Sequence, residues 1–224
     1  EKFLLELSGN CPDTAGLVTA WRRGEPGAVR TVDYLIGGTV YVTGLLTNLL
    51  DPALIVLGGD APGVGLLKAC AAEADFSIAA DRGLEAFDAA GMGPDMLIGD
   101  MDSVSPQVLA RYESRLSADR LNCIKDDTDG EYALNLALEK GATEITLLGA
   151  LGGRLDHALA NLMMVVRAAR HGAWAEIRAE GVRIVRVNGS CTLAGARGST
   201  ISLLPLGTAR GVSIRGCYYL IDDY

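Results

Sequence analysis

Between residues 53 and 171, short apolar runs alternate with segments of helical spacing, and this alternation constrains the fold more than any other feature of the sequence. The apolar runs lie at 53–57, 76–80, 95–99, 121–124 and 144–148, and the helical segments at 63–74, 84–90, 105–117, 129–140 and 155–171. Strands that alternate with helices at this spacing are typical of an open, mostly parallel sheet with flanking helices. We therefore predict a Rossmann-like α/β domain over residues 51–172.

The pattern changes after residue 172. Short β-type runs at 175–179, 182–187, 191–195, 199–206 and 211–220 are separated by Gly, Asn or Pro. This rhythm predicts a smaller antiparallel, β-sandwich-like domain over residues 173–224. Residues 1–50 are the least informative part, although two β-rich runs flank Gly37-Gly38 and favour a tight hairpin there.

Composition excludes several classes of protein. The chain has 224 residues, 49% of them hydrophobic, and a net charge of −8 without a basic tract, so we expect no nucleic-acid partner. Its apolar runs are too short to span a membrane, and we recognise no signal peptide. Five widely spaced cysteines without a CxxC pair argue against a zinc site or disulfide framework and for a reducing compartment, which we take to be the cytoplasm.

The run 96–103, MLIGDMDS, is a short apolar strand that ends in Asp100 and Asp102. Two neighbouring carboxylates at the end of a buried strand repel each other unless a cation meets them. Mg²⁺ suits such a place, because it binds one or two carboxylates together with substrate phosphates. A plain turn is an equally good explanation of the same residues, since Gly, Asp and Ser all favour turns.

Other polar and glycine clusters also follow predicted strands, where open α/β sheets bind their ligands. Gly58-Gly59-Asp60 follows the first strand, and Asp81 follows the second. The glycine pair matches neither a dinucleotide-binding nor a P-loop motif, so a tight turn explains it at least as well. The agreement in position among all the clusters carries more weight than any one of them.

A lysine beside three acids lies between the strand at 121–124 and the next helix, in the sequence Lys125-Asp126-Asp127-Thr128-Asp129. An ammonium group and metal ligands at a helix N-terminus suit a polyphosphate. Thr128 and Glu131 form a capping-box pattern for that helix. An acidic first helical turn is the alternative, but it leaves Lys125 unexplained.

The most specific run is GALGGRLDHALAN at 149–161. Its glycines allow backbone N–H groups to approach a phosphate, and the fork of Arg154 suits phosphate oxygens. Asp156 and His157 fall in the first helical turn, and Asn161 lies about one turn further along. For His157, an ordinary helix residue satisfied by its neighbours is as good an explanation as a binding role.

Together these motifs resemble the thiamine pyrophosphokinase family. The matching segments, in the same order and spacing, are GGDAP at 58–62, ADRG at 80–83, PDMLIGDMDS at 94–103, KDDTDGEYAL at 125–134 and GALGGRLDHALAN at 149–161. The resemblance covers roughly residues 53–215. It implies an Mg²⁺-dependent homodimer that moves the terminal diphosphate of ATP to the hydroxyl group of thiamine, giving thiamine diphosphate and AMP. It also implies an α/β catalytic domain, a C-terminal β-domain and a thiamine site near the subunit interface.

Carried onto this chain, the resemblance assigns a role to each matching residue. The implied metal ligands are Asp100, Asp102, Asp126 and Asp129, and the implied phosphate-neutralising residues are Lys125 and Arg154. Further ATP contacts are implied for Gly59, Asp60, Asp81, Asp126, Thr128, Gly152 and Gly153. The residues implied to bind thiamine are Asp156, His157 and Asn161. The expected catalytic set is Asp100, Asp102, Lys125, Asp129 and Arg154. Whether Asp102, Asp129 or neither acts as general base stays open.

The chain departs from the family pattern at three places. Arg82 stands where the family usually has a second glycine, the sequence stops before the family's last hairpin, and residues 1–50 have no usual counterpart. We hypothesise that residues 1–50 complete the C-terminal β-unit, with the Ser8–Asn10 region near thiamine. The competing functions are a pyrophosphokinase for another heterocyclic alcohol, such as a hydroxymethylpterin, and a nucleotide-binding sensor without turnover.

Overall fold

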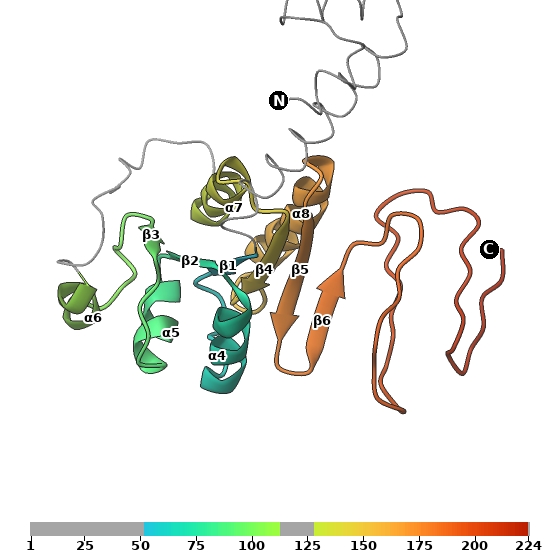
Figure 1. Ribbon diagram of the computed structural model, residues 1–224, viewed down its shortest axis with the longest axis horizontal. Coiled ribbons are helices and arrows are strands. Elements are labelled where there is room, and N and C mark those ends of the chain that lie inside the picture. The colour runs from blue at the N-terminus through green and yellow to red at the C-terminus, as the bar shows by residue number, and fades with distance from the viewer. Residues whose placement is uncertain (1–51, 113–127, 224) are drawn as a thin grey trace, which may run out of the picture. The chain divides into compact units, whose positions relative to one another are not determined.

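The computed structural model describes residues 52–112 and 128–223, and the chain divides after Arg186 into two compact units. The described part of the first unit forms a six-stranded sheet in the order β3-β2-β1-β4-β5-β6 (Figure 1). The strands are β1 (Ala53–Val56), β2 (Phe76–Ala80), β3 (Met96–Ile98), β4 (Glu144–Leu148), β5 (Trp174–Ala179) and β6 (Val182–Val185). Neighbours from β3 to β5 run parallel, and β6 is antiparallel to β5, which confirms the predicted open, mostly parallel α/β sheet.

Helices cover both faces of this sheet (Figure 1). One face packs against α4 (Val64–Glu73), α5 (Gly83–Ala89) and α6 (Pro106–Tyr112), and the other against α7 (Asp129–Glu139) and α8 (Leu155–Arg170). In β1, Leu54 and Val56 point to the first core and Ala53 and Ile55 to the second. All four are buried, as expected for a central parallel strand.

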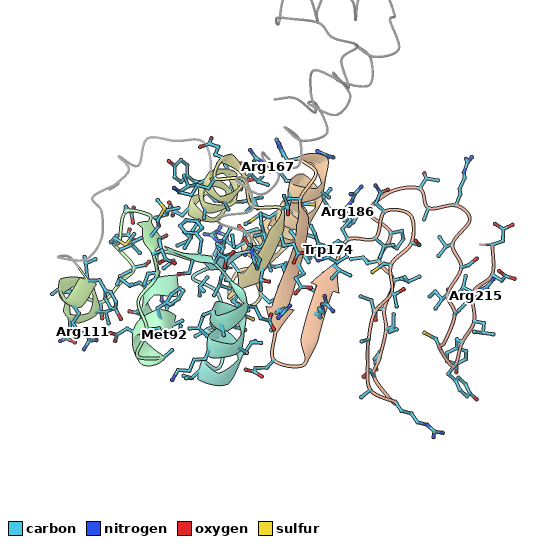
Figure 2. All side chains as sticks on the ribbon, viewed as in Figure 1. Met92, Arg111, Arg167, Trp174, Arg186 and Arg215 are labelled. Atoms are coloured by element: carbon cyan, nitrogen blue, oxygen red, sulfur yellow. The ribbon has the colours of Figure 1, made fainter. Side chains whose placement is uncertain are left out.

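Local sequence rules explain several helix ends. Thr128 and Glu131 form the predicted capping box: the Thr128 hydroxyl accepts from the Glu131 N–H at 3.2 Å, and the Glu131 carboxylate accepts from the Thr128 N–H at 3.1 Å. Arg167 of α8 also lies 3.8 Å from the Glu131 carboxylate and links the two helices of that face (Figure 2). Across residues 52–112 and 128–223, no helix combines the length and the apolar character needed to cross a membrane.

The strands β5 and β6 correct one prediction. We placed residues 174–187 in a separate antiparallel domain, but β5 pairs in parallel with β4, and β6 extends the same sheet. The predicted boundary near residue 172 therefore falls inside the first unit. The reason is α8, a 16-residue crossover helix between β4 and β5, because such a crossover returns the chain to a parallel strand.

The second unit, residues 187–223, contains no strand within its described part. Its one β-type pairing is an isolated antiparallel bridge between Ile214 and Ile221, so the strands predicted at 191–195 and 199–206 are wrong as judged from these residues. Extended segments need hydrogen-bonding partners to form a sheet, and the unit supplies few of them. Large apolar side chains such as Leu204 and Tyr218 stay exposed.

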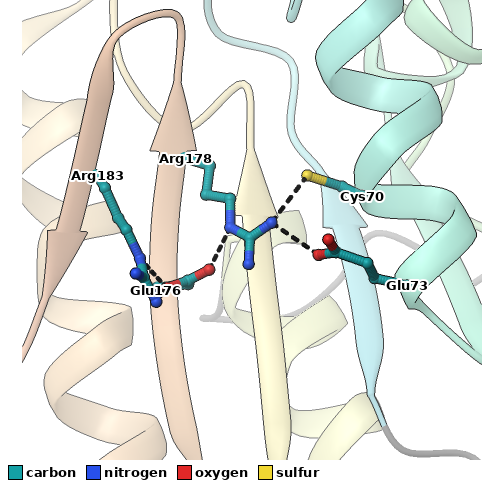
Figure 3. A network of polar contacts seen from close by, with 5 residues as sticks. All are labelled: Cys70, Glu73, Glu176, Arg178 and Arg183. Carbon is teal, nitrogen blue, oxygen red and sulfur yellow. Dashed lines mark hydrogen bonds and ion pairs between the residues drawn. The ribbon is translucent and has the colours of Figure 1, made fainter. Parts of the chain in front are cut away.

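A network of charged side chains links α4 to β5 and β6 (Figure 3). Arg178 pairs with Glu176, donates to the Glu73 carboxylate at 2.8 Å, and contacts the Cys70 sulfur at 3.7 Å. Arg183 donates to the other oxygen of Glu176 at 2.6 Å. These residues line a cavity of about 300 Å³ that opens beside the first residues of β1, β4 and β5. Burial would lower the pKa of Arg178, but the carboxylates of Glu73 and Glu176 outweigh it and raise that pKa.

Candidate functional site

The candidate site lies at the carboxyl ends of the parallel strands. The strand order reverses between β1 and β4, and the loops after these two strands meet there. Gly59 N–H donates to the Gly149 carbonyl at 2.9 Å, and Asp60 N–H donates to the Leu151 carbonyl at 2.8 Å. This reversal is the place where open α/β sheets bind their ligands. The glycine clusters predicted at 58–60 and 149–153 thus meet at the expected position.

The contact between these loops depends on glycine. A Cβ atom added to Gly59 would lie 2.3 Å from the Gly149 carbonyl oxygen, which is closer than any real contact. The Asp60 carboxylate lies against Gly152 of the opposite loop, and Gly153 is exposed next to it. Gly59, Asp60, Gly152 and Gly153, all predicted to contact ATP, therefore belong to one small region.

An acidic group lies beside the crossing loops, at the ends of β2 and β3 and the start of α7. Asp81 follows β2, Asp100 and Asp102 follow β3, and Asp129 begins α7. The Asp81 carboxyl group hydrogen-bonds with that of Asp129, and the charges of Asp129 and Asp100 act on it as well. The pKa of Asp81 is raised to about 7. Burial is the largest cause of this rise, and the contact with Asp129 is the next.

The backbone around Asp81 adopts unfavourable conformations. A Cβ atom added to Gly99 would lie 1.9 Å from Asp81 Oδ1, and Gly99 has a φ of +122°. Asp81 and Met101 adopt left-handed φ values of 46° and 64°, which side-chain-bearing residues seldom do. Such conformations gather at functional sites, where the surrounding structure holds them. Within the described ranges, Asp81 Oδ1 is buried without a hydrogen-bond partner.

Asp100 and Asp102 lie next to each other in the turn after β3. The Asp102 N–H donates to Asp100 Oδ1 at 3.1 Å. The negative charge of Asp100 is the main cause that raises the pKa of the exposed Asp102 carboxyl group, followed by a side-chain hydrogen bond with Asp100. The turn explanation of this stretch is confirmed, and the turn brings the two carboxylates together, while the metal explanation stays a prediction.

The donor set of this acidic group fits a divalent cation. A buried carboxylate oxygen without a partner in the described residues, and the raised pKa values of Asp81 and Asp102, mark a place where positive charge is favoured, and Mg²⁺ prefers carboxylate oxygens. Over residues 52–112 and 128–223, no three Asp, Glu, His or Cys side chains are already gathered as a metal-holding set. Asp126, one of the predicted ligands, lies outside the described residues, as do Lys125 and Asp127.

The loop before α8 holds the second predicted phosphate-binding element. Arg154 binds Asp156 with two hydrogen bonds, from Nε at 3.1 Å and from Nη2 at 2.5 Å. The hydrogen bonds from Arg154 lower the pKa of Asp156, and the same contact raises the pKa of Arg154. Both side chains are exposed, so a ligand phosphate can compete with Asp156 for Arg154.

The three residues predicted to bind thiamine do not play equal parts in this structure. Asp156 and His157 are exposed in the first turn of α8. Asn161 is half-buried, and its Nδ2 donates to the Ala150 carbonyl at 2.8 Å, so it holds the loop after β4. The visible role of the Asn161 amide is therefore to support the loop, and the assignment of all three residues to thiamine stays a prediction.

The sequence interpretation missed the partnership between Asp81 and Asp129. We expected Asp81 among the ATP contacts and Asp129 among the metal ligands, but the structure joins their carboxyl groups. The available signal was the position of Asp81 directly after an apolar strand, the same position that Asp100 has relative to the next strand. Parallel neighbouring strands place such residues at one edge.

Strand order, crossing glycine loops and an acidic group at one edge define a ligand-binding α/β domain of the doubly wound class. Residues 67–176 match the family model described as "Thiamin pyrophosphokinase, catalytic domain". Over these residues the chain is similar to the thiamin pyrophosphokinase family.

Two curated relatives carry the name of the same family. The chain is 33% identical over 117 residues to thiamine pyrophosphokinase of Bacillus subtilis (strain 168), covering 52% of this chain and 55% of the relative. It is 31% identical over 108 residues to thiamine pyrophosphokinase 1 of Oryza sativa subsp. japonica, covering 45% and 36%. It is also similar to the crystal structure of the Bacillus subtilis thiamine pyrophosphokinase, with 29% identity, a TM-score of 0.49, and coverage of 56% of this chain and 59% of that one. The chain thus spans less than two thirds of each of these proteins.

Proposed function

We propose that this protein transfers the diphosphate group of ATP to the hydroxyl group of thiamine, giving thiamine diphosphate and AMP, in an Mg²⁺-dependent reaction. The observation that carries the proposal is the acidic group of Asp81, Asp100, Asp102 and Asp129 beside the crossing glycine loops. The similarity of residues 67–176 to this family supplies the substrate class. The two curated relatives are named for the same activity.

The acidic group would hold the metal. Asp100 and Asp102 are the principal ligands in this proposal, and Asp126 and Asp129 add to them. When bound, Mg²⁺ would supply the positive charge that neutralises the phosphates during transfer. Asp81 then contributes through its contact with Asp129, because a cation near that pair relieves the repulsion between the two carboxylates.

Cationic side chains would bind the phosphates directly. Arg154 lies at the start of α8, where backbone N–H groups also point toward an anion. Its bidentate contact with Asp156 shows that the guanidinium fork is oriented for two oxygens on one plane. We assign the same task to Lys125. Asp156 and His157 would face thiamine, so the pair Arg154–Asp156 links the phosphate and acceptor ends.

Charge placement is the main source of rate enhancement in this proposal. The acceptor is an alcohol whose proton must leave while its oxygen attacks the β-phosphorus, so positioning and electrostatic stabilisation dominate. A carboxylate with a raised pKa accepts that proton more readily than an ordinary one, and Asp102 is exposed enough to receive it. Asp129 is the alternative base.

An assay of AMP and thiamine diphosphate release tests the proposal. The protein is incubated with ATP, Mg²⁺ and thiamine, and the products are separated by chromatography; equal amounts of both products are expected. A hydroxymethylpterin is offered in parallel as acceptor. Release of AMP with the pterin and not with thiamine would favour the second acceptor, and nucleotide binding without AMP release would favour a sensor.

We also propose that the protein is a cytoplasmic homodimer. Free thiols at Cys70, Cys191 and Cys217 agree with a reducing compartment. Sedimentation velocity on the full chain checks the dimer, and a single species of monomer mass at micromolar concentration would contradict it.

The proposed completion of the β-unit at 173–224 by residues 1–50 concerns a segment outside the described residues. The exposed apolar side chains of residues 187–223 support it, because they need a cover. In the full chain, aspartate substitutions at Val40 and Val42 are expected to speed hydrogen exchange of amides in 199–206. Unchanged exchange would contradict this part of the proposal.

A further inference from the structure

Arg82 lies between the two halves of the candidate site. It follows Asp81 at the end of β2 and precedes the first residue of α5. A Cβ atom added to Gly58 would lie 3.3 Å from the Arg82 Cβ, so the Arg82 side chain leaves the backbone against the glycine loop that follows β1. The Arg82 side chain therefore starts at the glycine loop and directly after Asp81 of the acidic group.

The guanidinium group of Arg82 is weakly engaged. Its recorded ion pair is with Glu85, at 3.6 Å between Nε and Oε2, which is too long for a good hydrogen bond. The other oxygen of Glu85 accepts the Ser105 N–H at 3.1 Å, so Glu85 is fixed to the chain that follows β3. Arg154 and Arg111, in contrast, each make a 2.5 Å contact with a carboxylate.

The surroundings explain what such a cation can do. The charges of Asp129 and Asp100 act on the nearby Asp81, yet Arg82 forms no ion pair with these carboxylates within the described residues. A polyphosphate that enters above the glycine loops brings several negative charges past this point. An arginine with unused donors at the rim is suited to phosphate oxygens, because its planar fork matches them.

We propose that Arg82 is an additional phosphate-binding residue of this chain, which takes an oxygen of the nucleotide's phosphate chain on the β2 side while Arg154 serves the β4 side. The inference rests on the proposed function. It gives a task to the residue that departs from the glycine usual in the family this chain resembles. Arg82 replaces a backbone approach to phosphate at this turn by a side-chain contact.

Titration calorimetry with Mg²⁺ and the non-reactive analogue α,β-methylene-ATP tests this inference. Arg82→Gln is expected to weaken analogue binding about tenfold or more, the usual loss for one charge-assisted hydrogen bond, and Arg82→Lys to restore part of it. Adenosine binding should not change, because adenosine carries no phosphate. Arg111→Gln is the matched control: both arginine side chains are 58% exposed, but Arg111 pairs with Asp88 on α5 (Figure 2).

Each result of this experiment has a distinct meaning. Equal analogue affinity in Arg82→Gln and in the unaltered chain would overturn the assignment of Arg82. An equal loss for adenosine and for the analogue would also overturn it, because the residue would then support the fold and not a phosphate. If the unaltered chain bound adenosine but not the analogue in the presence of Mg²⁺, the proposed function would fail first.

Discussion

Two groups of acidic side chains in this molecule differ in how their charge is compensated. On the α4 side of the sheet, Glu176 has a side chain only 4% exposed, and two arginines pair with it (Figure 3). At the carboxyl edge, the half-buried Asp81, whose Oδ1 is fully buried, shares a hydrogen bond with another carboxyl group and forms no ion pair within the described residues. A folded chain can bury a carboxylate in either way, but the two ways have different consequences.

The compensated group is complete without a ligand. Its two carboxylates and two guanidinium groups satisfy each other and carry no net charge together, so we assign this group a structural role. The uncompensated group is unfavourable by itself, because like charges at close range repel and raise pKa values. Such unfavourable groups persist where function requires them. The comparison therefore separates the acids to which we assign a structural role from those that we propose to be catalytic.

Neutralising the uncompensated acids should give the largest effect. Asp100→Asn and Asp102→Asn are each expected to lower kcat at least about a hundredfold, because each removes a main source of charge for the metal site. The matched control is Glu73→Gln in the compensated group, which should keep kcat within about twofold, since its pair with Arg178 is partly exposed. Near-normal turnover in both aspartate variants would refute the metal assignment.

Breaking the compensated group should affect stability and not chemistry. Arg178→Met leaves the buried Glu176 with Arg183 alone, and we expect it to lower the free energy of unfolding by about 2–3 kcal/mol. The measurement is urea unfolding at neutral pH, with kcat determined on the folded protein. Arg111→Met, which breaks an exposed pair with Asp88, should cost less than about 1 kcal/mol. Equal stability of the two variants would remove the distinction between the groups.

The comparison also shows which parts of this structure the sequence predicts. Strands β1 to β4 and helices α4 to α8 follow from apolar periodicity and caps such as Thr128, which act over a few residues. The parallel pairing of β5 with β4 depends on α8 as a crossover, so the β-rich run at 174–179 alone does not determine its partner. The strands expected at 191–206 fail because strand formation requires a neighbour, and local propensity cannot supply one.

At the candidate site, too, the sequence indicates the local features and not those that join distant residues. Asp100 and Asp102 are two positions apart in sequence, so their turn and the effect of Asp100 on the pKa of Asp102 are local properties that the sequence indicates. The contact of Asp81 with Asp129 joins residues 48 positions apart and depends on the order of the strands. The Glu176–Arg178–Glu73 network is also non-local, since it joins β5 to α4.

The pH dependence of stability sharpens the comparison further. The pKa of Asp81 is about 7 in the folded chain and about 3.9 when unfolded, so the folded state binds more protons between these values. The contribution of Asp81 to the free energy of unfolding should therefore be greatest below about pH 4 and should fall as the pH rises toward 7. Asp81→Asn removes this loss.

At pH 8 in EDTA, Asp81→Asn should raise Tm by roughly 3–6 °C, equivalent to about 1–2 kcal/mol for a half-buried group. Thermal melts between pH 5 and 8 give the slope, and Asp75→Asn, at an exposed position, is the control with an unchanged slope. Saturating Mg²⁺ should reverse the order of stability at pH 8, because the metal favours the aspartate. Parallel pH slopes for the Asp81 and Asp75 variants would show that Asp81 is an ordinary carboxylate.

The smallest expected effect concerns the exposed pair of Arg154 and Asp156, which stands between the two groups: it is compensated, yet a ligand can open it. Asp156→Asn frees the guanidinium group, and we expect Mg²⁺–α,β-methylene-ATP to bind about two- to fivefold more tightly, the worth of an exposed ion pair. Asp88→Asn frees Arg111 in the same way, away from the site, and should leave this affinity unchanged. Weaker analogue binding in Asp156→Asn would mean that Asp156 orients Arg154 for phosphate and does not compete with it, so that this pair belongs with the compensated, structural acids.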